Sequence, residues 1–168
     1  MSKEKEQPRE IDKLFKEYTE YHQNKTNINL RYLFVPLFIF SCMGLITATP
    51  FPHLAFLGKY NMFINWFSVA LAIAIYYYLK LSPLLSYLML FTFGALYFFI
   101  VQLEYVEQGG GPRLWQVSAV LFVISLIGLL WGGSLEKKKS SLWQKMHFIV
   151  IAPVWMWFQL VKRFNWRY

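Results

Sequence analysis

Cysteine is nearly absent from this chain. Cys42 is the only cysteine among 168 residues, and it lies inside an apolar run. A single cysteine excludes both an internal disulfide and a thiolate metal cluster. We therefore expect Cys42 to be a buried packing residue.

Charged residues are also few, and acidic residues are fewer than basic ones. Only 15% of the chain is charged, against 57% hydrophobic, and the net charge is +8. This composition is too apolar for an ordinary soluble domain. The basic residues lie beside the apolar runs instead of gathering on a soluble face, which excludes nucleic acid as the favoured partner and predicts contact with membrane lipid.

Three further absences narrow the possible functions. The run Gly109-Gly110-Gly111 lacks the preceding strand and the Gly-Lys-Ser/Thr ending of a phosphate loop, so it predicts a turn. The apolar runs hold no ionisable residue deep inside, so no ion or proton path is indicated. The first thirty-one residues lack a small-residue cleavage site, and we expect them to stay on the mature protein.

Four apolar runs predict the fold class: an all-α, multi-pass transmembrane helix bundle in a single membrane domain, residues 1–168. Each run is long enough to span a bilayer core at about 1.5 Å per residue. Prolines and glycines mark the breaks between them. The predicted spans are 32–48, 61–79, 83–103 and 114–131.

Two further segments are predicted to lie at the membrane surface. Residues 8–22 carry apolar side chains at helical spacing and predict an amphipathic surface helix whose apolar face continues to His22. The run 146–161 is short for a span and holds Pro153, which favours a re-entrant or interfacial segment. Lys and Arg lie mainly on one predicted side, so both termini are expected in the cytosol, at a bacterial inner membrane or the endoplasmic reticulum.

The polar segment before the first run has a recognisable spacing. Tyr18, His22, Asn24 and Asn27 are followed by Arg31 and then by Val35-Pro36-Leu37. This order resembles the first motif of the membrane 2-hydroxy fatty acid dioxygenase family, named for metabolism of phytosphingosine to odd-numbered fatty acids. The family pattern has a second histidine where this chain has Arg31.

A second motif of that family lies near the predicted last cytosolic loop. Glu136, the lysines at 137–139 and Pro153 match it, whereas the family's late histidine falls at Gly133, or at Gly132 with a one-residue gap. Leu129 and Ser140 also differ from the pattern. The resemblance covers most of the chain from Phe15 to Trp155.

The resemblance implies ferrous iron, held by histidines and used with dioxygen to shorten a 2-hydroxy fatty acid by one carbon. It makes His22, Asn24 and Asn27 the candidate catalytic residues, and His22 the possible metal ligand, with His147 and Glu136 as weaker ones. Arginine has no lone pair for a metal, so we expect no cofactor unless the activity is retained, in which case it is Fe²⁺. His53 is predicted to be a solvated loop residue on the opposite membrane face.

The basic residues of these motifs predict an anion site. Arg31 and the lysines at 137–139 would hold a lipid phosphate or a carboxylate. Simpler interpretations stay open: Arg31 as a positive anchor of the first span, Asn24 and Asn27 as caps of a turn, and His22 as a hydrogen-bonded structural residue.

Three functions follow from these alternatives. The first is a family member with a degraded metal site that binds an acyl or anionic lipid, such as a 2-hydroxy fatty acid, without turnover. The second is an active dioxygenase with a rearranged iron site around His22. The third is a structural membrane scaffold. The sequence leaves the oligomeric state undetermined.

Overall fold

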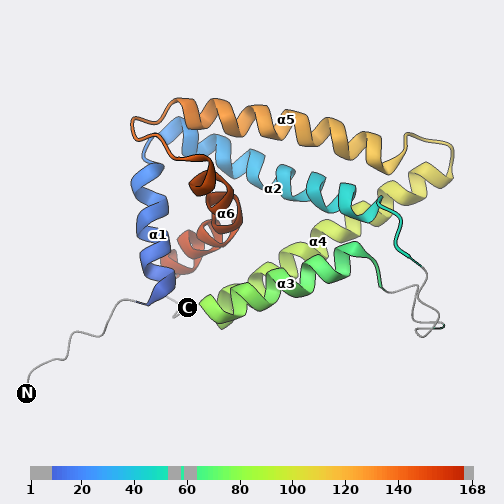
Figure 1. The fold of residues 1–168 in the computed structure, drawn as a ribbon, viewed down its shortest axis with the longest axis horizontal. Coiled ribbons are helices and arrows are strands. Elements are labelled where there is room, and N and C mark those ends of the chain that lie inside the picture. The colour runs from blue at the N-terminus through green and yellow to red at the C-terminus, as the bar shows by residue number, and fades with distance from the viewer. Residues whose placement is uncertain (1–8, 53–57, 59–63, 165–168) are drawn as a thin grey trace, which may run out of the picture.

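The structure is a computed structural model that describes residues 9–52, 58 and 64–164, and over these residues it contains six helices and no strand. The predicted all-α class is therefore confirmed. Figure 1 shows two helices running side by side, a second pair crossing them, and two more helices at one end. The helices are α1 (Glu10–Tyr21), α2 (Lys25–Thr47), α3 (Trp66–Leu81), α4 (Pro83–Gln108), α5 (Leu114–Ser134) and α6 (Leu142–Arg163).

Side-chain caps set where several helices begin. Asn65 and Ser68 form a reciprocal capping box at the start of α3, and Ser141 and Gln144 form another at the start of α6. The Ser82 hydroxyl accepts the backbone N–H of Leu85 at the start of α4, where proline occupies the first turn. The breaks expected from the sequence are thus built by local hydrogen bonding.

Helices α2 and α5 pack antiparallel along their lengths because small residues let the two backbones approach. A Cβ on Gly132 would lie 2.6 Å from Oδ1 of Asn27, and a Cβ on Gly128 would meet the ring of Phe34. Close approach through glycines four residues apart is typical of helix pairs in membranes. The α2–α5 pair therefore sets Asn27 of the first motif against Gly132 of the second.

Helices α3 and α4 form a hairpin that α6 joins to the rest. The rings of Phe67 and Tyr97 stack at 4.7 Å within the hairpin. The Tyr78 hydroxyl of α3 donates to the backbone carbonyl of Val150 at 2.9 Å, and the Trp157 indole N–H donates to Thr92 of α4 at 2.8 Å. Helix α6 is therefore held by hydrogen bonds to both members of the hairpin.

Helix α1 lies antiparallel to α6 at one end of the molecule (Figure 1). Phe15 stacks on Phe158 with ring centroids 4.4 Å apart, and further along the pair the Trp155 indole N–H donates to Thr19 at 3.1 Å. Ile11, Phe15 and Tyr18 are buried. The apolar stripe predicted for this segment is thus the face that packs on α6.

Three helices, α2, α4 and α5, are long and apolar enough to cross a membrane, and α3 is apolar but has 16 residues. Helix α2 begins seven positions before the predicted span, while α4 and α5 begin where predicted and extend further. The start of the predicted span 61–79 and residue 8 lie outside the described residues, as does His53. Helix α6 is continuous through Pro153 and contains the whole predicted segment 146–161.

Candidate anion site at the α1–α2 junction

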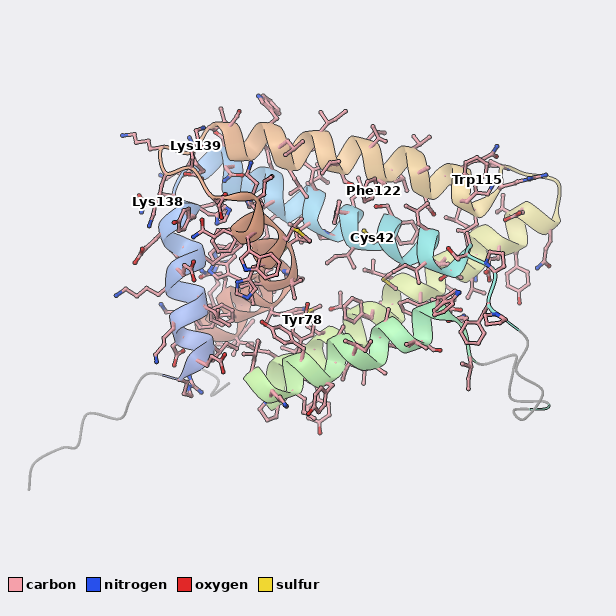
Figure 2. All side chains as sticks on the ribbon, viewed as in Figure 1. Cys42, Tyr78, Trp115, Phe122, Lys138 and Lys139 are labelled. Atoms are coloured by element: carbon pink, nitrogen blue, oxygen red, sulfur yellow. The ribbon has the colours of Figure 1, made fainter. Side chains whose placement is uncertain are left out.

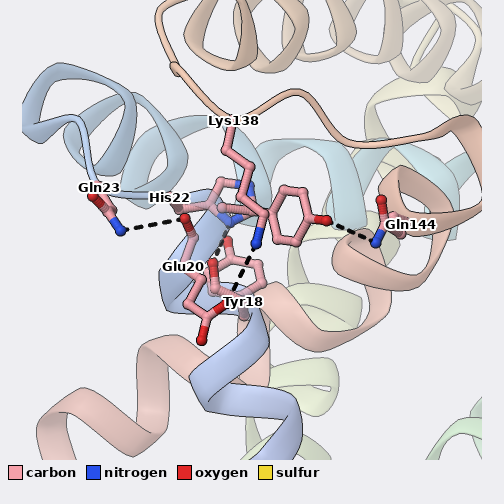
Figure 3. Close-up of polar contacts among 7 residues, drawn as sticks. Tyr18, Glu20, His22, Gln23, Lys138 and Gln144 are labelled. Atoms are coloured by element: carbon pink, nitrogen blue, oxygen red, sulfur yellow. Dashed lines mark hydrogen bonds and ion pairs between the residues drawn. The ribbon is translucent and has the colours of Figure 1, made fainter.

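His22 follows the last residue of α1 and is almost fully buried. Its backbone N–H bonds to Thr19, which leaves the carbonyl of Tyr18 to accept from the imidazole Nδ1 at 2.7 Å (Figure 3). The ring also stacks on Tyr18 at 4.2 Å and meets the edge of Phe148 at 5.2 Å. Because a carbonyl can only accept, Nδ1 carries the proton and Nε2 keeps the lone pair.

Glu136 joins the loop after α5 to the junction of α1 and α2. Its carboxylate accepts the backbone N–H groups of Gln23 at 3.2 Å and Asn24 at 3.0 Å, and the Asn27 side-chain amide at 2.7 Å. Asn27 is fully buried. The Asn24 side chain accepts the backbone N–H groups of Thr26 and Asn27, which confirms that Asn24 caps the start of α2. The Asn27 side chain instead links Glu136 to Arg31.

Arg31 lies between the two motifs. Its Nε donates to Oδ1 of Asn27 at 3.2 Å, and Nη1 donates to the Tyr18 hydroxyl at 3.2 Å. These two bonds fix the guanidinium plane and leave its remaining N–H groups for a ligand.

A cavity of about 270 Å³ opens beside these residues, between α1, α2, α5 and α6. Leucines of α5 and Phe148 of α6 are among its apolar lining residues, and four cationic side chains also line it, together with His22 and Glu136. The cations are Arg31, Lys138, Lys139 and Lys145. The cavity therefore offers one positively charged part and one apolar part.

Five of the predicted site residues line the cavity, namely His22, Arg31, Glu136, Lys138 and Lys139, while Asn24 and Asn27 contact Glu136 without lining it. Lys137 is exposed and does not line the cavity. His147 lies on α6 with Nε2 3.5 Å from the Tyr77 hydroxyl of α3, and within the described residues no three His, Cys, Asp or Glu side chains come together to hold a metal. His22 and Glu136 thus line one cavity, and His147 is not among its lining residues.

Lys145 also lines the cavity, although in the sequence it counted only among the basic residues that predict membrane orientation. It lies one turn into α6 and lines the same cavity as Arg31. Lys138 is held close by, donating to Glu20 at 3.3 Å and lying 4.0 Å from the Tyr21 ring centroid (Figure 3). Only the fold of α6 against α1 shows that Lys145 and Lys138 belong to one site.

Burial and charge set the protonation states of the two titratable groups. Burial first, and then the Arg31 charge, lower the pKa of His22 from 6.5 to about 4, against opposing effects of Tyr18 and Glu136. Burial raises the pKa of Glu136, but hydrogen bonds from Asn27, Asn24 and Gln23 more than offset this and the net pKa is lowered. The site therefore holds a neutral imidazole beside a carboxylate.

The depressed pKa of His22 predicts a loss of stability in acid. Between pH 6.5 and about 4 the unfolded chain binds a proton that the folded chain does not, so stability is full above pH 6.5 and falls as the pH is lowered towards 4. The full shift corresponds to about 3 kcal/mol. Melting temperatures of the detergent-solubilised protein across this range would measure the slope.

His22→Asn is the matched control, because the asparagine amide keeps a donor near the Tyr18 carbonyl and does not titrate. Its melting temperature should change less than that of the native protein from pH 6.5 to 4. Below about pH 4.5 both proteins also lose stability through Glu136, because its pKa is lowered in the folded state and the unfolded carboxylate takes up a proton first. Identical slopes for the two proteins would mean that His22 is not the group responsible.

The side chains of this site do not fit a ferrous ion. A typical non-haem Fe(II) oxygenase holds its metal with two imidazoles and a carboxylate. Here His22 is the single imidazole at the cavity, the Glu136 carboxylate is already bonded to three N–H groups, and Arg31 adds a positive charge. The arrangement is suited instead to an anion with an apolar part.

These features define the class of protein: it is all-helical, has helices long and apolar enough to cross a membrane, and has a cationic, partly apolar cavity at one end. A family described as 2-hydroxy-palmitic acid dioxygenase Mpo1-like matches residues 9–164. The chain belongs to this family, as its two motifs indicated. No curated protein and no solved structure matches the chain.

Proposed function

We propose that this protein binds a 2-hydroxy fatty acid in the cavity without iron-dependent turnover. The observation that carries the proposal is Arg31, which stands where the family has a histidine and is fixed beside the cavity by Asn27 and Tyr18. A guanidinium held in this way suits a carboxylate, and the leucine wall suits an acyl chain. The family description supports this class of ligand.

His22 gives the cavity a reason to prefer a 2-hydroxy acid. Its Nε2 carries a lone pair, because Nδ1 donates to Tyr18 and the lowered pKa keeps the ring neutral. A hydroxyl beside the bound carboxylate would donate to this nitrogen. A fatty acid without the hydroxyl would not form this hydrogen bond and would bind more weakly.

The expected result is that Arg31→Met weakens 2-hydroxypalmitate binding by about tenfold or more, the scale of a charge-assisted hydrogen bond. Arg113→Met is the matched control, since it removes the same charge at the other end of α5 and should bind like the native protein. Lys145→Met tests the charge at a residue on another helix. Binding would be measured by native mass spectrometry or equilibrium retention of labelled ligand.

Loss of affinity in Arg113→Met equal to that in Arg31→Met would show a general charge effect and reject the site. Absence of any saturable binding by the native protein would favour the third function, a structural scaffold. Both results require protein shown to be folded by its melting profile.

One observation favours a second function, an active dioxygenase with an iron site around His22. A metal-binding histidine usually donates its other ring N–H to a carbonyl or carboxylate, as His22 does to Tyr18. Stoichiometric iron in the purified protein, with consumption of 2-hydroxypalmitate and dioxygen that His22→Ala abolishes, would favour this function.

We further propose that the bundle has four spans, with α3 as the shortest, and that α1 and α6 lie at the cytosolic surface of a bacterial inner or endoplasmic reticulum membrane. The antiparallel contact of α1 with α6 supports this, because it sets the start of α1 beside the end of α6. Both chain ends would then emerge on the same side.

The topology prediction can be tested with single cysteines in a Cys42→Ala background. Lys3→Cys and Arg167→Cys should react equally with a membrane-impermeant maleimide, and both from the cytosolic side. Labelling of the two positions from opposite faces would contradict the surface placement of α6.

A further inference from the structure

A second cavity lies between α2, α3, α4 and α6 and has a volume of about 310 Å³. The residues that line it include no charged side chain. Figure 2 labels two of them, Cys42 on α2 and Tyr78 on α3. The Tyr78 hydroxyl already donates its hydrogen bond to the Val150 carbonyl, so Tyr78 offers no free donor to a ligand in the cavity.

Ile149 lines both this cavity and the cationic one. It lies on α6 four residues before Pro153, which has no N–H to give to the Ile149 carbonyl, so the helix lacks one backbone bond at this point. Ile149 is only partly buried. The residue that the two cavities share therefore lies on a locally weakened turn.

We infer that the two cavities form one extended site, in which the acyl tail of a ligand anchored at Arg31 passes Ile149 and lies in the second cavity beside Cys42. This inference rests on the proposed function for its charged end. Arg31 and Cys42 are eleven residues apart on α2, about 16 Å along the helix axis. A single unbranched long chain covers this distance, whereas a medium chain ends in the first cavity.

The charge distribution supports this occupant. The first cavity has four cationic side chains and the second none among its lining residues, so a molecule that fills both must have an anionic end and a long apolar end. A fatty acid has this form. Octanoate is expected to use only the first cavity.

Photocrosslinking tests where the tail lies. The probe is palmitate with a diazirine at the methyl end, added to the full-length protein in detergent and competed with unlabelled 2-hydroxypalmitate. The expected competed crosslinks fall on the second-cavity residues of α2 and α3, such as Cys42 and Tyr78. Competed crosslinks on the outward faces of α4 or α5 would overturn the inference but leave the proposed function standing.

Ile149→Trp should block the passage. We expect it to reduce the second-cavity crosslinks at least fivefold per molecule of bound probe, a ratio that corrects for any change in the first cavity, which Ile149 also lines. Ile127→Trp is the matched control, because Ile127 is an exposed isoleucine on α5, at 61% exposure. Equal crosslinking in the two variants would overturn the inference.

Cys42 gives a second measurement that needs no variant, since it is the only thiol in the chain. Saturating 2-hydroxypalmitate should slow its reaction with a small permeant maleimide, and saturating octanoate should not. Equal protection by both acids would mean that the tail does not reach Cys42. Absence of binding by either acid would reject the proposed function itself, and the inference with it.

Discussion

The double variant Arg31→His with Gly133→His is expected to bind Fe(II) where the native protein does not. Positions 22, 31 and 133 line the same cavity, so two added imidazoles would join the one of His22. A Cβ on Gly133 meets nothing within 4 Å, which leaves room for the side chain. Removing Arg31 also removes the positive charge that opposes a cation.

The size of the effect should depend on having three ligands together. Either single variant should retain far less iron, because two imidazoles hold the metal much less well than three. The measurement is elemental analysis of protein purified without a histidine tag. Catalytic activity need not appear, since Leu129 and Ser140 also differ from the family pattern.

A matched control follows from the two glycines that the sequence left as alternatives. Gly132 faces α2, and a Cβ there would lie 2.6 Å from Oδ1 of Asn27. Arg31→His with Gly132→His should therefore disturb the α2–α5 contact and bind little iron. Equal background iron in all four variants, in folded protein, would mean that positions 22, 31 and 133 do not form a common site.

Glu136→Gln is expected to destabilise the protein by about 3 kcal/mol, the scale of breaking hydrogen bonds to a buried charged group. The carboxylate accepts from two backbone N–H groups and from the Asn27 amide. A glutamine has one acceptor oxygen, so its NH₂ group would be turned towards N–H donors. Denaturation of the solubilised protein, followed by circular dichroism, would measure the loss.

Glu20→Gln is the matched control for this change. Glu20 is an exposed acid in an ion pair with Lys138 at 3.3 Å, and such surface pairs contribute less than about 1 kcal/mol. A similar loss of stability in both variants would show that Glu136 does not hold the loop to the helix junction in the way the structure describes.

Local patterns predicted the helices and part of the site. Helical spacing of apolar residues identified α1, and the long apolar runs identified α2 to α5. Both patterns can be predicted because they depend only on residues that are neighbours along the chain. The capping interpretation of Asn24 is likewise local. The family spacing pointed to His22 and Glu136, which do line one cavity.

Contacts between distant segments could not be predicted in the same way. The bond from Arg31 to Asn27 is local, since the two residues lie four apart on α2, but the bond from Arg31 to Tyr18 needs the turn between α1 and α2. The place of Lys145 in the cavity depends on the packing of α6 on α1. His147 was a candidate metal ligand because the sequence does not show which neighbour it faces. In the structure it lies on α6 beside Tyr77 of α3.

The most direct test of the central claim is 2-hydroxypalmitate binding by protein stripped of metal with a chelator. We expect saturable binding that is unchanged when Fe(II) is added, is weakened in Arg31→Met, and is accompanied by no dioxygen consumption. Binding that appears only with Fe(II), together with consumption of the acid and of dioxygen, would contradict the claim and show that the site remains a dioxygenase.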